Sequence, residues 1–276
     1  MSIIAGETIK VTRVSEGIAW EADDELAAEE PLQIQMQYGS SNNRVQKNIA
    51  VTMRTPGNDG ELATGFLFTE GIINSKDQVD SILQSSNSAD TITIVLKENI
   101  EPGKDTSDRN FYTTSACGVC GKSSIDAIAT HSIFKNEKDN SKVSASLLYE
   151  LPAQLRRQQA LFENTGGLHA AALLNTDGSF ITLREDVGRH NALDKLIGVS
   201  LLKDQLPLTG CILLLSGRTS FELIQKAMMA GIKFIAAIGA PSSLAVELAK
   251  QNDITLIGFL KSDRFNIYSG EKRVLV

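Results

Sequence analysis

Two cysteines, Cys117 and Cys120, stand two residues apart in a stretch that runs from residue 111 to residue 122. Polar residues precede the pair, and glycine, lysine and two serines follow it before apolar residues begin to recur at helical spacing. Free N–H groups at a helix N-terminus and the cation of Lys122 both stabilise a thiolate. We therefore expect at least one of the two cysteines to be a reactive nucleophile.

Three kinds of chemistry use two cysteines at this spacing. A zinc site needs two further ligands, and besides carboxylates the chain offers Cys211, His131, His169 and His190. A thioredoxin-like dithiol follows the first strand of a small βαβ domain, whereas more than a hundred residues precede this pair. The third possibility is a thiol that carries sulfur as a persulfide, assisted by the second cysteine. The pair alone does not decide among them.

Composition narrows the class of protein. The chain has 276 residues, of which 42% are hydrophobic, and a net charge of −6. It is long enough to bury a sizeable core and too acidic for a broad nucleic-acid surface. Uninterrupted apolar runs stay below the roughly 18 residues that a membrane span needs, and the first residues lack the pattern of a signal peptide. These features, with an odd count of three cysteines, predict a soluble protein of the reducing cytoplasm.

Short alternating runs dominate the first 110 residues. The segments 8–14, 32–36, 48–53 and 91–96 alternate apolar and polar residues, which predicts half-buried strands, antiparallel in the first three segments. Residues 61–70 carry apolar residues on one helical face, and Gly71 ends that helix. We therefore predict a β-rich N-terminal lobe over 1–110. The cysteine loop and connecting helices follow over 111–162, including a helix at 144–159 that Pro152 shortens or kinks.

Strands alternate with helices from residue 163 to residue 276. Apolar runs at 168–174, 180–183, 211–215, 233–238 and 254–260 are separated by helical segments over most of this range. The pattern predicts an α/β lobe with a mixed or parallel sheet and helices on both faces. Cys211 begins one of the buried runs, so we interpret it as a small core residue.

Three loops of this lobe follow strands and open helices, namely 184–190, 216–220 and 239–243. Ligands bind outside the carboxyl ends of parallel strands, and free helical N–H groups there suit phosphate. Arg184, Arg189 and Arg218 would add cations. Serine and threonine at such positions are also ordinary helix caps. Three such loops on one edge nevertheless favour an anionic ligand.

His169 and His190 fall near the same expected edge. Each is either a hydrogen-bonded structural residue or an acid–base group. The segment 258–268 places aromatic residues beside Lys261 and Arg264. That mixture can stack on a base and pair with a phosphate, or it can form an ordinary hairpin.

The chain resembles the formate dehydrogenase accessory sulfurtransferase family, FdhD. Motifs spread over most of its length carry the resemblance: Arg54-Thr-Pro-Gly-Asn58, Gly65-Phe-Leu-Phe-Thr-Glu-Gly71, Cys117-Gly-Val-Cys-Gly-Lys122, Thr165-Gly-Gly-Leu-His169, Glu185-Asp-Val-Gly-Arg-His-Asn-Ala192, Ser216-Gly-Arg218, Ala240-Pro-Ser-Ser-Leu-Ala245 and Gly258-Phe-Leu260. At two positions, Gly239 and Lys261, the resemblance implies serine and arginine instead.

The resemblance implies a sulfur carrier with a persulfide intermediate. Such a protein accepts sulfur from a cysteine desulfurase and passes it to molybdenum cofactor in its guanine-dinucleotide form, for formate dehydrogenase. Cys117 would hold the persulfide, with Cys120 beside it. The resemblance also implies a homodimer, cofactor contacts at 259–264 and a fold similar to cytidine deaminases, although the deaminase zinc signature is absent.

Together with the loops, these implications define an expected site for a transient cargo, with no metal ligands and no permanently bound cofactor. Its cofactor-binding residues are expected to be Phe259, Leu260, Lys261, Ser262, Asp263, Arg264, Arg218, Ser216, His190, Arg189 and His169. Two other functions use the same residues: a chaperone that binds molybdenum cofactor without sulfur chemistry of its own, and a thiol oxidoreductase.

Overall fold

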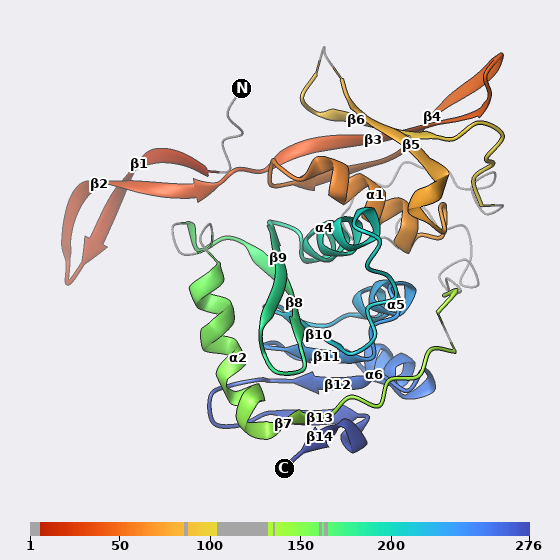
Figure 1. Cartoon of the computed structure of the whole chain (residues 1–276). Helices are drawn as coiled ribbons and strands as arrows, with labels where there is room; N and C mark the ends of the chain where they lie inside the picture. The colour runs from red at the N-terminus through yellow and green to blue at the C-terminus, as the bar shows by residue number, and fades with distance from the viewer. Residues whose placement is uncertain (1–5, 86–87, 104–131, 135, 160–161, 163–164) are drawn as a thin grey trace.

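The computed structural model describes residues 6–85, 88–103, 132–134, 136–159, 162 and 165–276. Within them the chain forms a mixed α/β fold built around two sheets, a larger one from the C-terminal part and a smaller one from the N-terminal part (Figure 1). The domain boundaries expected from the sequence remain a prediction.

The larger sheet has the strand order β13-β12-β11-β10-β8-β9. Its three central strands are parallel: β10 (Cys211–Leu215), β11 (Phe234–Ala237) and β12 (Thr255–Gly258). The outer strands pair antiparallel with their neighbours: β8 (His169–Asn175), β9 (Phe180–Asp186) and β13 (Asn266–Ser269). The sheet is therefore mixed. The cytidine-deaminase-like arrangement that the resemblance implies stays a prediction.

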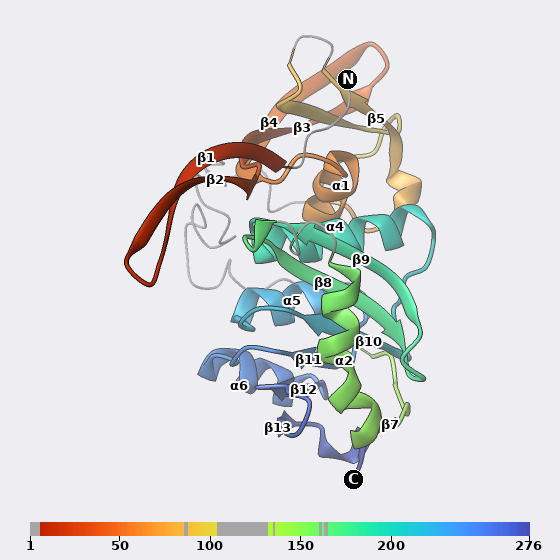
Figure 2. The same ribbon diagram turned by 90° about the vertical axis from the view of Figure 1, so that its left-hand side faces the viewer.

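Helices cover both faces of this sheet, as the apolar runs predict. Side chains alternate along each strand between two cores. In β10, for example, Leu213 faces one core and Leu214 the other. Helix α2 (Ala145–Gln158) packs on one face through Leu148, Leu151 and Leu155. The other face is covered by α4 (Arg189–Leu202), α5 (Phe221–Met229) and α6 (Ser243–Gln251) (Figures 1 and 2).

The smaller sheet has the order β4-β3-β6-β5. Its strands are β3 (Glu30–Ser40), β4 (Asn43–Arg54), β5 (Val79–Gln84) and β6 (Thr91–Leu96). Strand β3 is antiparallel to β4, as expected, and parallel to β6. A short 3-10 helix, η1 (Lys76–Gln78), leads into β5.

Helix α1 (Asp59–Thr69) joins the smaller sheet to the rest of the molecule by crossing α4 at close range. A Cβ atom at Gly65 would lie 1.9 Å from the carbonyl oxygen of Asp194, and one at Gly198 would lie 1.9 Å from that of Glu61. Glycine is therefore required on both helices at this crossing. Leu62 and Leu67 from α1 and Leu193 from α4 share one continuous core with both sheets.

A two-stranded hairpin of β1 (Gly6–Ser15) and β2 (Ile18–Ala27) stands away from the body (Figures 1 and 2). Val14 and Ile18 near its tip are 65% and 68% exposed. Sequence reasoning missed β2, because its residues include two glutamates and two aspartates, which occur rarely in strands. Lys10 and Arg13 of β1 pair with Asp23 and Asp24 of β2.

Two expectations about the connecting segments can be checked. Pro152 lies inside α2, yet that helix runs without a break from Ala145 to Gln158. The C-terminal end of the chain adds η4 (Glu271–Arg273) and β14 (Val274–Leu275), which pairs with β7 (Val143–Ser144). Among the described residues, no helix combines the length and the apolar character that a membrane crossing requires.

Candidate functional site

Loops from five strands meet at one edge of the larger sheet. The parallel strands β10, β11 and β12 all end there, and β8 begins there because Leu215 of β10 pairs with Ala171 of β8. His169 of β8 pairs with Asp186, the last residue of β9. The convergence expected from the sequence therefore exists, with the starts of α4, α5 and α6 on the same edge.

Backbone hydrogen bonds tie these loops to one another. The N–H of Gly239 donates to the carbonyl of Gly217 at 3.2 Å, and the N–H of Phe259 donates to the carbonyl of Gly239 at 3.1 Å. A Cβ atom at Gly239 would lie 2.7 Å from the backbone of Gly217 and Arg218. A serine, which the family resemblance implies here, could not enter without the two loops moving apart.

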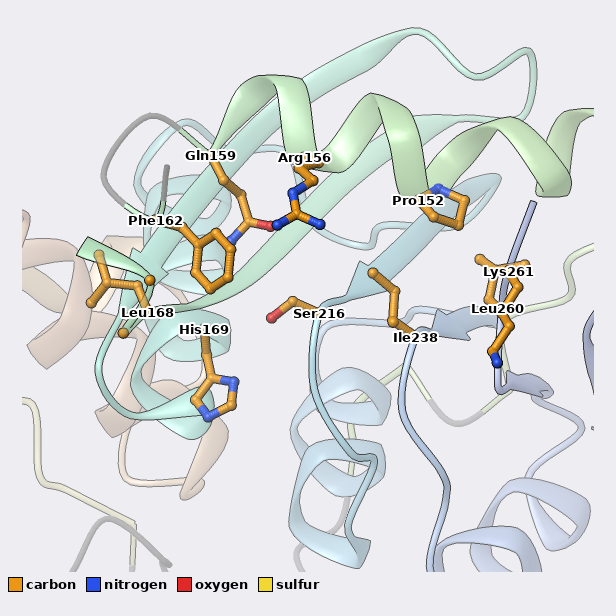
Figure 3. Close-up of a pocket in the computed structure, with 12 residues that line it drawn as sticks. Pro152, Arg156, Gln159, Phe162, Leu168, His169, Ser216, Ile238, Leu260 and Lys261 are labelled. Atoms are coloured by element: carbon orange, nitrogen blue, oxygen red, sulfur yellow. The ribbon is translucent and has the colours of Figure 1, made fainter. Parts of the chain in front are cut away.

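A cavity of about 610 Å³ lies between this edge and the C-terminal half of α2 (Figure 3). This is within the range of pockets that hold small-molecule ligands, roughly 300–1,000 Å³. Four residues expected from the sequence line it: His169, Ser216, Leu260 and Lys261. The other lining residues are Pro152, Arg156, Gln159, Phe162, Gly166, Gly167, Leu168 and Ile238.

Ser216 holds two strands together inside this site. Its hydroxyl oxygen accepts a hydrogen bond from the N–H of Ala170 at 2.8 Å, and its own N–H donates to the carbonyl of Ala170 at 3.0 Å. The residue thus fixes the end of β10 against the start of β8, where His169 stands. The Ser216 hydroxyl therefore has two roles: one of its lone pairs holds β10 against β8, and the residue also lines the cavity.

His169 is half-buried in a positively charged setting. Burial, then the charges of Arg189 and Arg218, lowers the pKa of His169 below its ordinary value. The imidazole is therefore neutral at pH 7. Within the described part of the chain, the buried Nε atom of Arg189 has no hydrogen-bond partner, and Arg218 is exposed. An anion near this histidine would relieve the mutual repulsion of these cations.

His190 lies apart from the described cavity lining. It is buried, and its Nε2 atom lies 3.2 Å from the hydroxyl oxygen of Ser220 and 4.0 Å from a carboxylate oxygen of Glu222. Ser220 precedes α5 but makes no side-chain cap bond, whereas Ser242 caps α6 through the N–H of Ala245. Ser242 is therefore an ordinary helix cap, one of the two roles that the sequence allowed for these serines, whereas Ser220 is not.

Arg184 does not serve the anion site that the sequence suggested. Its Nε and Nη2 atoms donate to the two carboxylate oxygens of Glu61 in α1, at 2.5 and 2.9 Å. The guanidinium is committed to this bidentate ion pair. It therefore joins β9 to α1 instead of meeting a ligand.

A buried ion pair positions the start of α4. Lys195 Nζ lies 2.7 Å from an oxygen of Asp186, and both side chains are almost fully buried. Asp186 also accepts from the N–H of Gly188 at 2.8 Å and from the N–H of Thr55 at 3.2 Å, while Lys195 donates to the carbonyl of Thr55. The motifs at 54–58 and 185–192 are thereby locked together, which places Arg189 at the edge.

The segment 259–264 forms a tight turn beside the cavity. Phe259 has a positive φ of 52° and is 45% exposed, while Leu260 is buried among the core residues under α2. The N–H of Lys261 donates to the carbonyl of Arg264 at 2.9 Å, which closes the turn. Ser262, Asp263 and Arg264 are exposed at its tip, outside the described cavity lining.

Sequence reasoning missed the wall that α2 supplies. Arg156, Gln159 and Phe162 come from the end of α2 and the segment after it, and Arg156 lies 5.9 Å from the centre of the Phe162 ring. In the sequence, these residues are marked only by the polar last turn of a helix that has one apolar face. Many solvent-exposed helices share this pattern, so it does not identify a binding site.

The cysteines divide into two cases. Cys117 and Cys120 lie outside the described residues. Cys211 is partly buried at the start of β10, and burial, then Asp139, raises the pKa of its thiol, as befits a packing residue. Cys211 pairs with Asn175 at the far end of β8 from His169. At roughly 3.3 Å per residue the two ends are about 20 Å apart, so Cys211 and His169 cannot bind the same metal ion. The described part of the chain contains no group of three potential metal-binding side chains.

The fold and site define a mixed α/β protein with a cavity at the edge of its larger sheet that Arg156 and Lys261 help to line. The chain belongs to the FdhD/NarQ family, whose model matches residues 27–275.

Similar proteins match over nearly their full length. "Sulfur carrier protein FdhD" of Mycolicibacterium paratuberculosis is 46% identical over 96% of this chain and 97% of its own. Proteins of the same name from Streptomyces coelicolor and Sulfolobus acidocaldarius are 44% and 41% identical, over 97% and 96% of this chain and 95% and 97% of theirs. A crystal structure described as that of a candidate formate dehydrogenase accessory protein from Desulfotalea psychrophila aligns with a TM-score of 0.73, at 22% identity, over 99% of this chain and all of that one. At that identity the likeness concerns the fold.

Proposed function

We propose that this protein carries sulfur for the maturation of formate dehydrogenase. The observation that carries the proposal is the near-full-length similarity, at 40–46% identity, to proteins named sulfur carrier protein FdhD. The Cys117–Cys120 pair supplies thiols of the kind that such a role needs. An acidic protein with an odd number of cysteines suits the reducing cytoplasm, where we place this activity.

The sulfur enters by thiol–disulfide-type exchange. The thiolate of Cys117 attacks the outer sulfur of a persulfide on a cysteine desulfurase, and the desulfurase leaves as its own thiolate. Cys117 then carries a persulfide, without net oxidation. In the delivery step, the thiolate of Cys120 attacks the inner sulfur of Cys117 and displaces hydrosulfide. The electrons for this reduction come from the two cysteines, which end as a disulfide.

The recipient of the sulfur is molybdenum cofactor in its guanine-dinucleotide form, bound as cargo. The cavity beside His169, Ser216 and Lys261 supports this substrate, because it combines apolar walls with cations at the rim. Arg189 and Arg218, whose charges act on His169, would supply the cations for a diphosphate. Phe259 and Arg264, on the exposed turn next to the cavity, can contact the remainder of a ligand larger than the cavity itself.

A homodimer is part of the proposal. The β1–β2 hairpin exposes apolar side chains at Val14, Ile18 and Trp20, which gives a second copy a surface to cover. The alternative function is a chaperone that binds the molybdenum cofactor without sulfur chemistry of its own. In that case the cavity works as described while Cys117 and Cys120 are structural.

Sulfur loading separates the two functions. The protein is incubated with a cysteine desulfurase and cysteine, and intact-mass spectrometry with peptide mapping locates any added sulfur. We expect one added sulfur on Cys117, lost in Cys117→Ala together with activation of formate dehydrogenase. Cys211→Ala is the matched control, because the thiol of Cys211 is a packing residue with a raised pKa. If neither Cys117→Ala nor Cys120→Ala lowers loading or activation, the chaperone function is correct.

A further inference from the structure

A second cavity, of about 400 Å³, lies at the opposite edge of the larger sheet from the first. Lys233 directly precedes β11 and lines the second cavity, whereas Ile238 directly follows β11 and lines the first. At roughly 3.3 Å per residue these two positions are about 16 Å apart. The other residues that line the second cavity are Asn136, Glu137, Lys138, Asp139, Asn140, Gln251, Asn252, Asp253 and Lys272. The second cavity is therefore a separate place in the fold, and its described lining is wholly polar.

Lys233 is a buried cation in this lining. The residue is 6% exposed. Within the described part of the chain, its Nζ atom donates one hydrogen bond, at 3.2 Å to the carbonyl of Asn252, and makes no ion pair. An ammonium group has three N–H donors, so two of them have no acceptor among the described residues. A ligand that brings acceptors would satisfy them.

Two carboxylates near Lys233 are engaged with other groups. Asp253 pairs with Arg273 at 2.7 Å and with Lys272 at 2.8 Å. Asp139 accepts hydrogen bonds from two backbone N–H groups, at 2.8 and 2.9 Å. Neither carboxylate is therefore available as the direct partner of the Lys233 ammonium group.

The charges around the second cavity balance without Lys233. The other described residues whose charges lie there are three carboxylates and three cations: Glu137, Asp139, Asp253, Lys138, Lys272 and Arg273. Lys233 is thus the cation in excess. Burial, with a smaller contribution from Arg273, lowers the pKa of Lys233, although Asp253 opposes the shift. An anion in the cavity would supply the counter-charge that this buried amine lacks.

The same balance favours one negative charge on the ligand over two. A single excess cation matches a monoanion, and the carboxylates of the lining would repel a dianion such as phosphate more strongly. The side-chain amides of Asn136 and Asn140 line the cavity and can donate to a second ligand oxygen. A carboxylate has two oxygens and a single charge, so it suits this lining.

We propose that the second cavity binds a small monocarboxylate, with one of its oxygens accepting hydrogen bonds from the ammonium group of Lys233. This site goes beyond the proposed function, because it uses neither the cysteine pair nor the first cavity.

NMR titration of ¹⁵N-labelled protein with sodium acetate, at constant ionic strength, tests the proposal. The backbone amide signals of Asn252 and Asp253 report on the cavity. In wild type we expect them to shift and to saturate as acetate is added. Lys233→Met removes the charge-assisted hydrogen bond, so it should weaken acetate binding at least about tenfold.

Lys250→Met is the matched control. Lys250 lies in α6 next to Gln251, but it is exposed and does not belong to the described lining. This variant removes the same charge from the same part of the surface. It should bind acetate as wild type does.

Three results would overturn the proposal. The first is a wild-type titration that does not saturate, and this result depends on no variant. The second is equal acetate affinity in wild type and Lys233→Met, which would remove Lys233 from the site. The third is binding of inorganic phosphate or chloride at the same signals as tightly as acetate, which would show that the cavity does not select a carboxylate.

Discussion

The two walls of the cavity are built in different ways. At the sheet edge, backbone hydrogen bonds join Gly217, Gly239 and Phe259, and Ser216 ties β10 to β8. The wall at the end of α2 presents side chains instead, among them Arg156 and Gln159. A backbone-built wall resists substitution and holds charge in place, whereas a side-chain wall can change its specificity at little cost in stability. We therefore expect the sheet-edge wall to determine how tightly a ligand binds, and the α2 wall to determine which ligand is bound.

The largest effect on the sheet-edge wall should come from its buried ion pair. Asp186→Ala leaves the ammonium of Lys195 buried without its carboxylate, which costs about 3–5 kcal/mol of unfolding free energy. Urea denaturation measures this loss. Asp23→Ala removes the partner of Lys10 in an exposed pair and should cost at most about 1 kcal/mol. Equal losses in both variants would show that the buried pair does not hold the edge.

A smaller effect is expected where two loops of this wall approach each other. Gly239→Ser puts a Cβ atom 2.7 Å from the backbone of Gly217 and Arg218, for a loss of about 1–3 kcal/mol. Gly167→Ala is the control, because its new Cβ would meet its nearest neighbour at 3.7 Å and should be tolerated. Thermal unfolding compares the two. A stable Gly239→Ser variant would mean that the backbone-built wall is more adaptable than its hydrogen bonds indicate.

The smallest effect concerns His169, and it depends on pH. Its pKa in the folded protein lies below the value of 6.5 for the unfolded chain. As the pH falls below 6.5, the unfolded chain takes up a proton before the folded protein does, so stability is lost until the pH reaches the folded pKa. The loss is at most about 1.4 kcal/mol per pH unit. His169→Asn should therefore lose less stability than wild type between about pH 7 and pH 5, as followed by urea denaturation. Identical losses would mean that burial and the nearby cations do not lower the pKa of His169.

The sheet-edge wall could be predicted from the sequence. Apolar runs such as 211–215, each followed by glycine and serine and then a helical pattern, indicate parallel strands whose loops meet. That reasoning located His169 and Ser216 on one edge, whereas Lys261 was expected from the basic and aromatic segment 258–268 and from the family resemblance. The same reasoning was wrong for Arg184. Its guanidinium pairs with Glu61, which lies more than a hundred positions away in the sequence, and no residue near position 184 indicates this pairing.

The α2 wall could not be predicted in the same way. Its apolar face shows that the helix packs on something, but which end of it meets the cavity depends on how the helix docks on the sheet. Gln159 carries no sequence signal, since an ordinary surface glutamine looks the same. The strand β2 was missed for a related reason: its acidic residues are stabilised by Lys10 and Arg13 on the neighbouring strand, which local propensity does not include.

The most direct test of the central claim, that the cavity edge binds the nucleotide part of the cargo, is calorimetric titration with GDP. We expect wild type to bind GDP with an affinity that falls as salt concentration rises, and Arg218→Ala to lose about tenfold or more, on the order of 1.5–3 kcal/mol. Arg13→Ala, near the tip of the β1–β2 hairpin, removes the same charge and should bind as wild type does. Equal GDP affinity in wild type, Arg218→Ala and Arg264→Ala would contradict the claim and move the cargo site away from this edge.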